Sequence, residues 1–201
     1  MLEIVVSHYN NIHFEKFLTF FNDDTKTIIY DKSNLYENTE LEIKKIKNEG
    51  REGETYLRHI IENYDNLREY TLFIQDDTNN HIISNNLFYN ETQKIMSDNI
   101  QFYQYKVSWR EGGSIYTRTI NNGNCDVDTA FPSRSSINET CSKHNIYLPT
   151  IYRTETCAFF IVHKNIILKR SKEFYINLRL WLLEDDRNGY VLEHIWYLIF
   201  C

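Results

Sequence analysis

The chain has 201 residues, of which 42% are hydrophobic and 15% aromatic, so it is long enough to bury the core of one domain. Its formal net charge of −6 argues against a nucleic-acid partner or an acidic membrane surface. The densest basic run, Lys44, Lys45 and Lys47, is flanked by glutamates and favours a solvated helix face. We therefore expect a single domain over residues 1–201.

Nothing in the sequence predicts a membrane anchor. It starts with MLEIVVSHYN, which lacks the charged and apolar regions of a signal peptide, and no apolar stretch is long enough to cross a bilayer. The cysteines Cys125, Cys141, Cys157 and Cys201 are far apart, which disfavours a zinc site and a disulfide framework. We expect a cytoplasmic protein with Cys157 in its core.

Hydrophobic periodicity predicts alternating strands and helices in the first half. Segments 3–7, 27–31 and 71–75 are short and apolar, as parallel strands buried on both faces should be. Segment 14–21 suits a helix, and apolar residues recur at helical spacing in 51–64. This order predicts an α/β sheet of Rossmann-like character, in which ligands bind at the carboxyl ends of the strands.

The second half has a different pattern. Residues 101–109 alternate like a strand, whereas residues 110–156 are rich in Gly, Asn, Ser and Thr and show little periodicity. A loop region of this length inside a domain is usually functional or mobile. A buried strand at 157–163 and two amphipathic helices, at 171–185 and 190–200, close the chain.

Polar side chains follow each of the three predicted parallel strands. They are Ser7, His8, Tyr9 and Asn10 after the first, Asp31, Lys32 and Ser33 after the second, and Asp76 and Asp77 after the third. We expect them to meet at one edge of the sheet. Two adjacent carboxylates there suit Mg²⁺ or Mn²⁺, which take oxygen ligands and are commonly shared with substrate phosphates. A polar turn with Asx capping is the alternative.

Two other acidic pairs compete with this pair. Asp126 and Asp128 form a literal Asp-x-Asp, but a turn-like segment and not a buried strand precedes them. Asp185 and Asp186 lie at a predicted helix end before a glycine, where a solvated turn explains them.

The predicted helix at 51–64 has a second face. That face carries Glu52, Thr55, His59 and Glu62. Gly50 and Gly53 would let a backbone approach the helix N-terminus, which favours anions, and Arg51 adds a positive charge. An ordinary amphipathic helix with a solvated face is the alternative, and these residues alone favour it.

Several segments resemble, in order and spacing, a family of uncharacterised domains found in fungi, bacteria and large DNA viruses. They are IVVSHYN, IIYDKS, EGREGETYLRHIIENYDNL, LFIQDDTNNH, FFIVHKNIILKRSKEFYINLRLWL and GYVLEHIWYLIF. GRE-x-x-TYL-x-HI and VLE-x-x-W-x-x-IF are the most specific, and the resemblance covers nearly the whole chain apart from roughly 82–156. That family is similar to GT-A-fold glycosyltransferases, including one encoded by large algal viruses.

The resemblance implies a GT-A-like mixed sheet flanked by helices. It also implies transfer of a sugar from a nucleotide-diphosphate donor, with a UDP-sugar as the foremost candidate, to a glycan or protein acceptor, with Mn²⁺ or Mg²⁺. The chain departs from the Asp-x-Asp pattern, because Asp76 and Asp77 are adjacent and Thr78 stands where a second aspartate would be. A catalytically inactive nucleotide- or glycan-binding member of the same fold is the alternative. A viral member would act in the host cytoplasm.

Roles for single residues follow from the resemblance and the strand ends together. Asp77 would contact the metal, and Asp76 would join it or face the ribose. Donor binding is expected from Ser7, Tyr9, Asn10, Asp31, Lys32, Arg51 and Asp76. Glu193 in VLEHIW is the candidate acceptor-side base, with a helix-surface salt bridge as the alternative. Residues 110–156 would shape the acceptor side.

Overall fold

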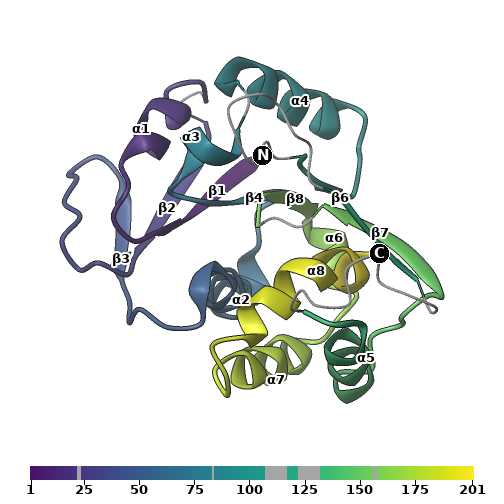
Figure 1. Cartoon of the computed structure of the whole chain (residues 1–201). Helices are drawn as coiled ribbons and strands as arrows, with labels where there is room; N and C mark the ends of the chain where they lie inside the picture. Colours follow the sequence, from purple (N-terminus) through teal and green to yellow (C-terminus); the bar gives the residue numbers. More distant parts are fainter. Residues whose placement is uncertain (22–23, 83, 107–116, 122–131, 156–157) are drawn as a thin grey trace.

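A mixed sheet of six strands forms the centre of the protein. The computed structural model describes residues 1–21, 24–82, 84–106, 117–121, 132–155 and 158–201 (Figure 1). The strands, in spatial order, are β3 (Glu42–Lys45), β2 (Lys26–Asp31), β1 (Leu2–His8), β4 (Tyr70–Gln75), β8 (Phe160–His163) and β5 (Phe102–Gln104). The first four are parallel, whereas β8 runs antiparallel to both β4 and β5. The predictions at Cys125, Asp126, Asp128 and Cys157 lie outside the described residues.

Helices cover both faces of this sheet. They are α1 (His13–Leu18), α2 (Arg51–Asn63), α3 (Thr78–His81), α4 (Asn85–Ser97), α5 (Arg134–Lys143), α6 (Lys164–Ile167), α7 (Lys172–Leu182) and α8 (Asn188–Phe200), with a 3₁₀ turn at Tyr64–Asn66. Figure 1 shows α1, α3 and α4 above the sheet and α2, α5, α7 and α8 below it. The predicted α/β class with a mixed sheet flanked by helices is confirmed.

Alternation along the central strand divides the core in two. Ile4 and Val6 pack with Phe14 and Phe17 of α1, whereas Val5 between them packs with α2, α7 and α8. Successive side chains of a strand point to opposite faces, so a continuous apolar run is what a strand covered on both sides requires. Strand β1 is therefore packed on both faces up to the point where it ends.

Helix α2 is buried on two sides, so the expectation of a solvated face is wrong. Thr55 and His59 have no exposed surface, because that face of the helix lies against the sheet. Thr55 and Ser7 of β1 share a hydrogen bond of 3.0 Å, and His59 lies 3.0 Å from Glu3. The other face packs against α7 and α8.

Two further expectations are wrong in part. Lys44 and Lys45 belong to the edge strand β3 and not to a helix. The segment 110–156 contains regular structure, since β6 (Thr117–Asn121) and β7 (Ile151–Glu155) pair as an antiparallel ribbon and α5 lies between them in the chain. Ser133 caps α5 by accepting a hydrogen bond of 3.2 Å from the N–H of Ser136. Among the described helices, none is long and apolar enough to cross a membrane.

Candidate functional site

The strand order reverses at β1, which makes the carboxyl ends of β1 and β4 the expected place for a ligand. The chain passes from β1 to β2 and β3 on one side and returns to β4 on the other. The N–H of Lys32 donates to the carbonyl of His8 at 2.8 Å, and the N–H of Asp76 donates to the carbonyl of Ser7 at 3.1 Å. The three strand ends therefore meet at one edge, as the sequence predicts.

Asp76 holds the loop that follows β1. Its Oδ2 accepts hydrogen bonds from the N–H groups of Tyr9, Asn10 and Asn11 at 2.8, 3.0 and 2.9 Å. Burial alone would raise the pKa of Asp76, but His8 and these three N–H groups outweigh it and hold the pKa below its usual value. One carboxylate oxygen of Asp76 is thus committed to the protein's own backbone.

Asp31 plays the same part after β2. Its carboxylate is completely buried and accepts from the N–H and hydroxyl of Ser33, at 2.9 and 2.6 Å, and from the N–H of Tyr36 at 3.1 Å. The ring of His8 lies between the two aspartates, with Nε2 3.9 Å from Asp31 and Nδ1 3.1 Å from Asp76. Asp31 therefore fixes a loop and presents no surface to a ribose in this conformation.

The turn before α2 is held by a buried lysine. Lys32 directs its ammonium group at the carbonyl oxygens of Glu49, at 2.7 Å, and Arg51. Burial lowers the pKa of Lys32 to about 8. Gly50 and Arg51 both have left-handed backbone conformations, with φ of 61° and 52°, and such a conformation is uncommon for a residue other than glycine. Lys32 thus fixes the backbone from which the Arg51 side chain projects.

Arg51 reaches from α2 to α8. Its Nη2 donates to Oε1 of Glu193 at 3.1 Å, and its Nε lies 3.7 Å from Oε2 of Glu52. The guanidinium carbon also lies 4.2 Å from the centre of the Tyr190 ring, where the cation is attracted to the aromatic face. The guanidinium is thus held by two carboxyl groups and an aromatic ring.

Glu52 and Glu193 form a carboxyl pair beside this arginine. Burial and the negative charge of Glu52 raise the pKa of Glu193 to about 9, against the opposing effect of Arg51. The two carboxyl groups also interact through a side-chain hydrogen bond, which favours the protonated form of Glu193. From the sequence, Glu52 was placed on a helix face and given no role. Its position directly after Arg51 in the GRE motif could have indicated that it belongs to the site.

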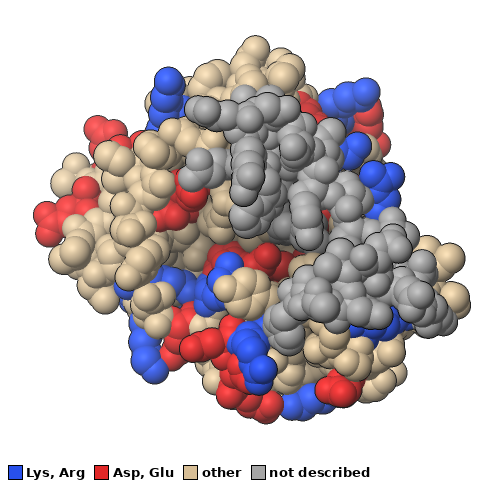
Figure 2. Space-filling model, viewed as in Figure 1, with Lys and Arg blue, Asp and Glu red and all other residues tan. Residues whose placement is uncertain are grey.

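Asp77 follows β4 at the same edge of the sheet. Its Oδ1 accepts a hydrogen bond of 3.2 Å from the Asn11 side chain. Burial lowers the pKa of His81, while the negative charges of Asp77 and Glu52 both act to raise it. The two carboxylates therefore lie within electrostatic reach of one histidine, although they come from different elements. Figure 2 shows acidic and basic atoms together in the middle of this face, between the upper and lower helix layers.

The fit of a divalent metal rests on Asp77. Among the described residues, no three His, Cys, Asp or Glu side chains lie together as a set of metal ligands. Mg²⁺ is commonly held by one or two carboxylates together with substrate phosphates, so Asp77 fits as a protein ligand that needs the donor to complete the site. Asp76 fits less well, because its Oδ2 already accepts three hydrogen bonds.

The remaining predicted donor residues divide into two groups. Tyr9 is 51% exposed and Asn10 is exposed, so both are accessible at the end of β1. Ser7 and Lys32 are buried and bonded to Thr55 and to backbone carbonyls. The first pair can touch a ligand directly, whereas the second supports the site from behind.

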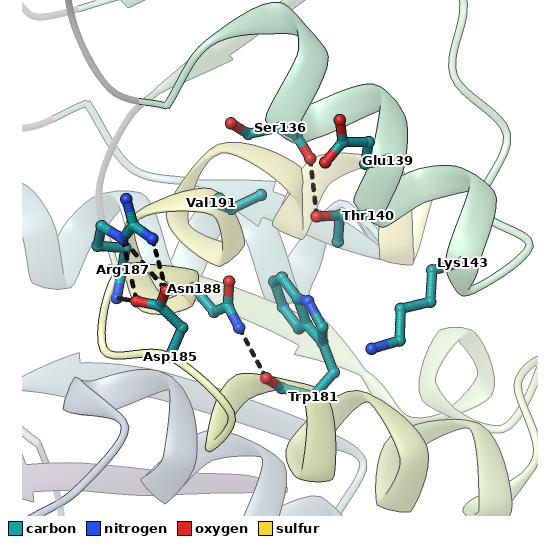
Figure 3. Close-up of a pocket in the computed structure, with 9 residues that line it drawn as sticks. All are labelled: Ser136, Glu139, Thr140, Lys143, Trp181, Asp185, Arg187, Asn188 and Val191. Carbon is teal, nitrogen blue, oxygen red and sulfur yellow. Dashed lines mark hydrogen bonds and ion pairs between the residues drawn. The ribbon is translucent and has the colours of Figure 1, made fainter.

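A second concave region lies between α5, α7 and α8 (Figure 3). It has a volume of about 360 Å³ and is lined by Ser136, Glu139, Thr140, Lys143, Trp181, Asp185, Arg187, Asn188 and Val191. Figure 3 shows Arg187 turned towards Asp185, at 2.7 Å, and Lys143 pairs with Glu184 at 2.9 Å. Both basic groups have acidic partners on the exposed rim, which agrees with the solvated turn predicted at Asp185.

Comparison with known proteins identifies a family. The family model described as "Protein of unknown function (DUF3431)" matches residues 4–201, nearly the whole chain. No curated protein matches the chain. The predicted membership of a family of uncharacterised domains is confirmed.

Proposed function

The chain belongs to the DUF3431 family, and from this premise we propose that it is a glycosyltransferase. It would move a sugar from a nucleotide-diphosphate donor, foremost a UDP-sugar, to a glycan or protein acceptor, with Mn²⁺ or Mg²⁺, in the cytoplasm. The observation that carries the proposal is that Arg51 is held against two carboxyl groups, Glu52 and Glu193, close to the strand ends where the sheet order reverses.

The sequence and the sheet support a GT-A-like fold as part of this proposal. The segments that resemble the family of uncharacterised domains, which is itself similar to GT-A glycosyltransferases, include the strands β1, β2 and β4 and the helices α2 and α8. Helices α2 and α8 supply Arg51 and Glu193, and Asp77 follows β4 in one of the same segments. The resemblance and the candidate site thus rest on the same parts of the chain.

Donor binding would use groups at the ends of β1, β4 and α2. Tyr9 and Asn10 offer an exposed aromatic ring and an amide for the nucleoside. Arg51 would pair with the diphosphate, because a guanidinium matches phosphate oxygens geometrically. Asp77 would hold the metal together with the diphosphate, and the bound metal would supply neutralisation of the charge on the departing group.

Acceptor activation would use the carboxyl pair. In the transfer, the bond between the anomeric carbon and the diphosphate oxygen breaks, and a bond from that carbon to the acceptor oxygen forms. The acceptor hydroxyl must release its proton, which the ionised member of the Glu52–Glu193 pair can accept. Because burial and the negative charge of Glu52 raise the pKa of Glu193, we assign the base function to the pair and not to Glu193 alone.

The test separates turnover from binding. Purified protein would be screened by thermal shift against UDP-sugars with and without Mn²⁺, since a ligand that binds only the folded state raises the apparent stability. Hits would then be followed by the release of UDP in the presence of glycan acceptors. We expect Asp77→Asn to abolish Mn²⁺-dependent stabilisation, and Glu193→Gln and Glu52→Gln to keep it while the rate falls about 10²-fold or more.

Three outcomes decide the proposal. Donor-dependent stabilisation with turnover that the carboxyl variants lose supports a glycosyltransferase. Stabilisation without turnover for any acceptor points to the inactive nucleotide-binding alternative. Full activity of Glu193→Gln and Glu52→Gln would show that the carboxyl pair is not the base. Asp185→Asn is the matched control, because Asp185 lines the pocket between α5, α7 and α8, and this variant should keep the binding and the rate of the wild type.

A further inference from the structure

We propose that the groove between β5, β7 and α8 binds a saccharide chain, which serves as the acceptor if the transfer proposed above is correct. The groove has a volume of about 550 Å³. It is lined by Phe102, Tyr103, Gln104, Pro149, Ile151, Tyr152, Arg153, Glu155 and Tyr197. Only the role of the bound saccharide as an acceptor rests on the proposed function. Saccharide binding itself can be measured without a donor.

The aromatic side chains of the groove are held in fixed positions. Tyr103 points to the α4 side of the sheet, where its hydroxyl donates to Glu91 at 2.5 Å, so Phe102 and Tyr197 are the rings that share one face. Phe102 packs with ring centres 5.3 Å from Phe200 and 6.2 Å from Tyr197. A pyranose ring has an apolar face of C–H groups that packs against an aromatic ring, and rings that are already fixed lose little entropy when it binds.

The groove also contains one basic and one acidic side chain, Arg153 and Glu155. Side chains alternate along β7, so that Arg153 and Glu155 face outward while Tyr152 and Thr154 are buried in the core. The guanidinium of Arg153 offers donors and the carboxylate of Glu155 offers acceptors, and their charges cancel. Aromatic faces beside balanced donors and acceptors suit an uncharged polyhydroxylated ligand better than an anionic or a cationic one.

Helix α8 contributes one residue, Tyr197, to the groove and Glu193 to the carboxyl pair. Tyr190, Glu193 and Tyr197 are three and four positions apart, so they follow one another on the same side of the helix. The rise from Glu193 to Tyr197 is about 6 Å, close to the length of one sugar unit. Tyr197 is 40% exposed and lines the groove. A saccharide lying in the groove would thus end near the group proposed to accept a proton.

Through their pairing with β8, Phe102 and Gln104 of the groove are level with Thr71 and Phe73 of β4, before the end of that strand at Gln75. Both β4 and β5 run antiparallel to β8, so β5 is parallel to β4. The carboxyl end of β5 at Gln104 therefore faces the same direction as that of β4 at Gln75. A peptide added to β5 as an extra strand is the rival occupant, but β5 has only three residues and offers few backbone groups for pairing.

The binding experiment uses the whole chain and no donor. An array of neutral oligosaccharides, including β-linked and α-linked glucose, mannose and N-acetylglucosamine chains, would be probed with the wild type and then titrated with the best ligand. We expect Tyr197→Ala and Arg153→Ala to weaken binding about tenfold or more, whereas Tyr197→Phe keeps the ring and retains binding. Tyr147→Ala is the matched control, since Tyr147 is an exposed tyrosine outside this groove.

Each result either supports or overturns the inference. Saccharide binding that is lost in Tyr197→Ala and Arg153→Ala but not in Tyr147→Ala supports the inference. If no nucleotide sugar binds in the same protein, the proposed transfer fails, but the assignment of the groove as a saccharide site still holds. Absence of binding to every oligosaccharide overturns it. Binding that the groove variants leave unchanged overturns it as well, and so does groove-dependent binding of unstructured peptides in place of saccharides.

Discussion

A Cβ atom on Gly189 would lie 2.5 Å from Cδ of Arg51, so the arginine side chain occupies the space that any larger residue at this position of α8 would need. The arginine comes from the first turn of α2 and the glycine from the first turn of α8. The two helix starts therefore meet at Arg51, and the next turn of α8 supplies Glu193. The contact couples the packing of two helices to the position of one guanidinium group.

The substitution Gly189→Ala should separate the position of Arg51 from the stability of the fold. Alanine is favoured over glycine inside a helix by about 1 kcal/mol, so the free energy of unfolding should not fall much. The new methyl group must displace the Arg51 side chain from its place between Glu52 and Glu193. We expect the affinity for UDP, measured by calorimetry, to fall about tenfold, equivalent to about 1.4 kcal/mol.

Gly53→Ala provides the control for that change. A Cβ atom on Gly53 would lie 2.7 Å from Cδ2 of Leu192, inside the contact between α2 and α8. Overpacking of this kind costs about 1–3 kcal/mol, so this variant should lose stability without a specific effect on UDP. If Gly189→Ala binds UDP as tightly as the wild type, Arg51 does not contact the diphosphate.

Parts of the fold could be predicted because they depend on local pattern. The ends of β1, β2 and β4 lie within one residue of the predicted ends, since strands buried on both faces must be continuously apolar. In β3 the sequence EIKK has one apolar residue, and the strand exists because its backbone pairs with β2. Helix α5 escaped prediction because only Ile137, Thr140 and Cys141 are buried in a serine-rich segment.

The site shows a similar division. Arg51 and Glu193 each stood out in a specific motif, but their ion pair spans 142 positions and depends on how α2 and α8 pack. A carboxylate after a strand looks the same in sequence whether it binds a ligand or a loop, and Asp76 binds a loop. The role of such a residue is decided by which N–H groups tertiary structure brings to it.

Asp76→Asn should destabilise the fold more than Asp77→Asn does. Hydrogen bonds to a charged group contribute about 1.5–3 kcal/mol, and Asp76 accepts three from the loop at Tyr9, Asn10 and Asn11. We expect a loss of about 2 kcal/mol or more for Asp76→Asn in urea denaturation. Asp77 is half-buried and accepts a hydrogen bond of 3.2 Å from the Asn11 side chain, so its variant should lose less stability than Asp76→Asn.

The pH dependence of stability checks the same assignment. The pKa of Asp76 is lowered on folding, so its contribution is complete above the unfolded value, near 3.9, and disappears as the pH falls through the lower folded value. The wild type should therefore lose more stability between pH 5 and pH 3 than Asp76→Asn does. Parallel profiles for the two proteins would contradict the role of Asp76 as an ionised acceptor.

Lys32→Met tests whether the buried ammonium group positions Arg51. The variant leaves the carbonyl groups of Glu49 and Arg51 without their donor, and unpaired buried polar groups cost about 1–3 kcal/mol. We expect a loss of stability in this range together with weaker binding of UDP. Lys26→Met is the control, because Lys26 pairs with the carboxylates of Glu3 and Glu42 and lies at the opposite end of β2. Unchanged UDP affinity in a destabilised Lys32→Met variant would limit Lys32 to a structural role.

Glu193→Gln tests whether the carboxyl pair holds a proton. The pKa of Glu193 is raised from 4.5 to about 9 on folding, so between these values the folded protein keeps a proton that the unfolded chain releases. Because the folded state then binds more protons, this group makes stability fall as the pH rises. Glutamine cannot ionise, and we expect the stability of Glu193→Gln relative to the wild type to increase from pH 5 to pH 8 in urea denaturation.

Glu184→Gln serves as the matched control, since Glu184 is exposed and pairs with Lys143 at the surface. Its difference from the wild type should stay constant over the same pH range. A constant difference for Glu193→Gln as well would mean that Glu193 is ionised and forms an ordinary salt bridge with Arg51. In that case the two carboxyl groups would share no proton, and Glu193 alone would be the carboxylate that accepts the proton of the acceptor hydroxyl. If the stability of Glu193→Gln relative to the wild type instead rises with pH, the two carboxyl groups beside Arg51 share a proton before any ligand binds.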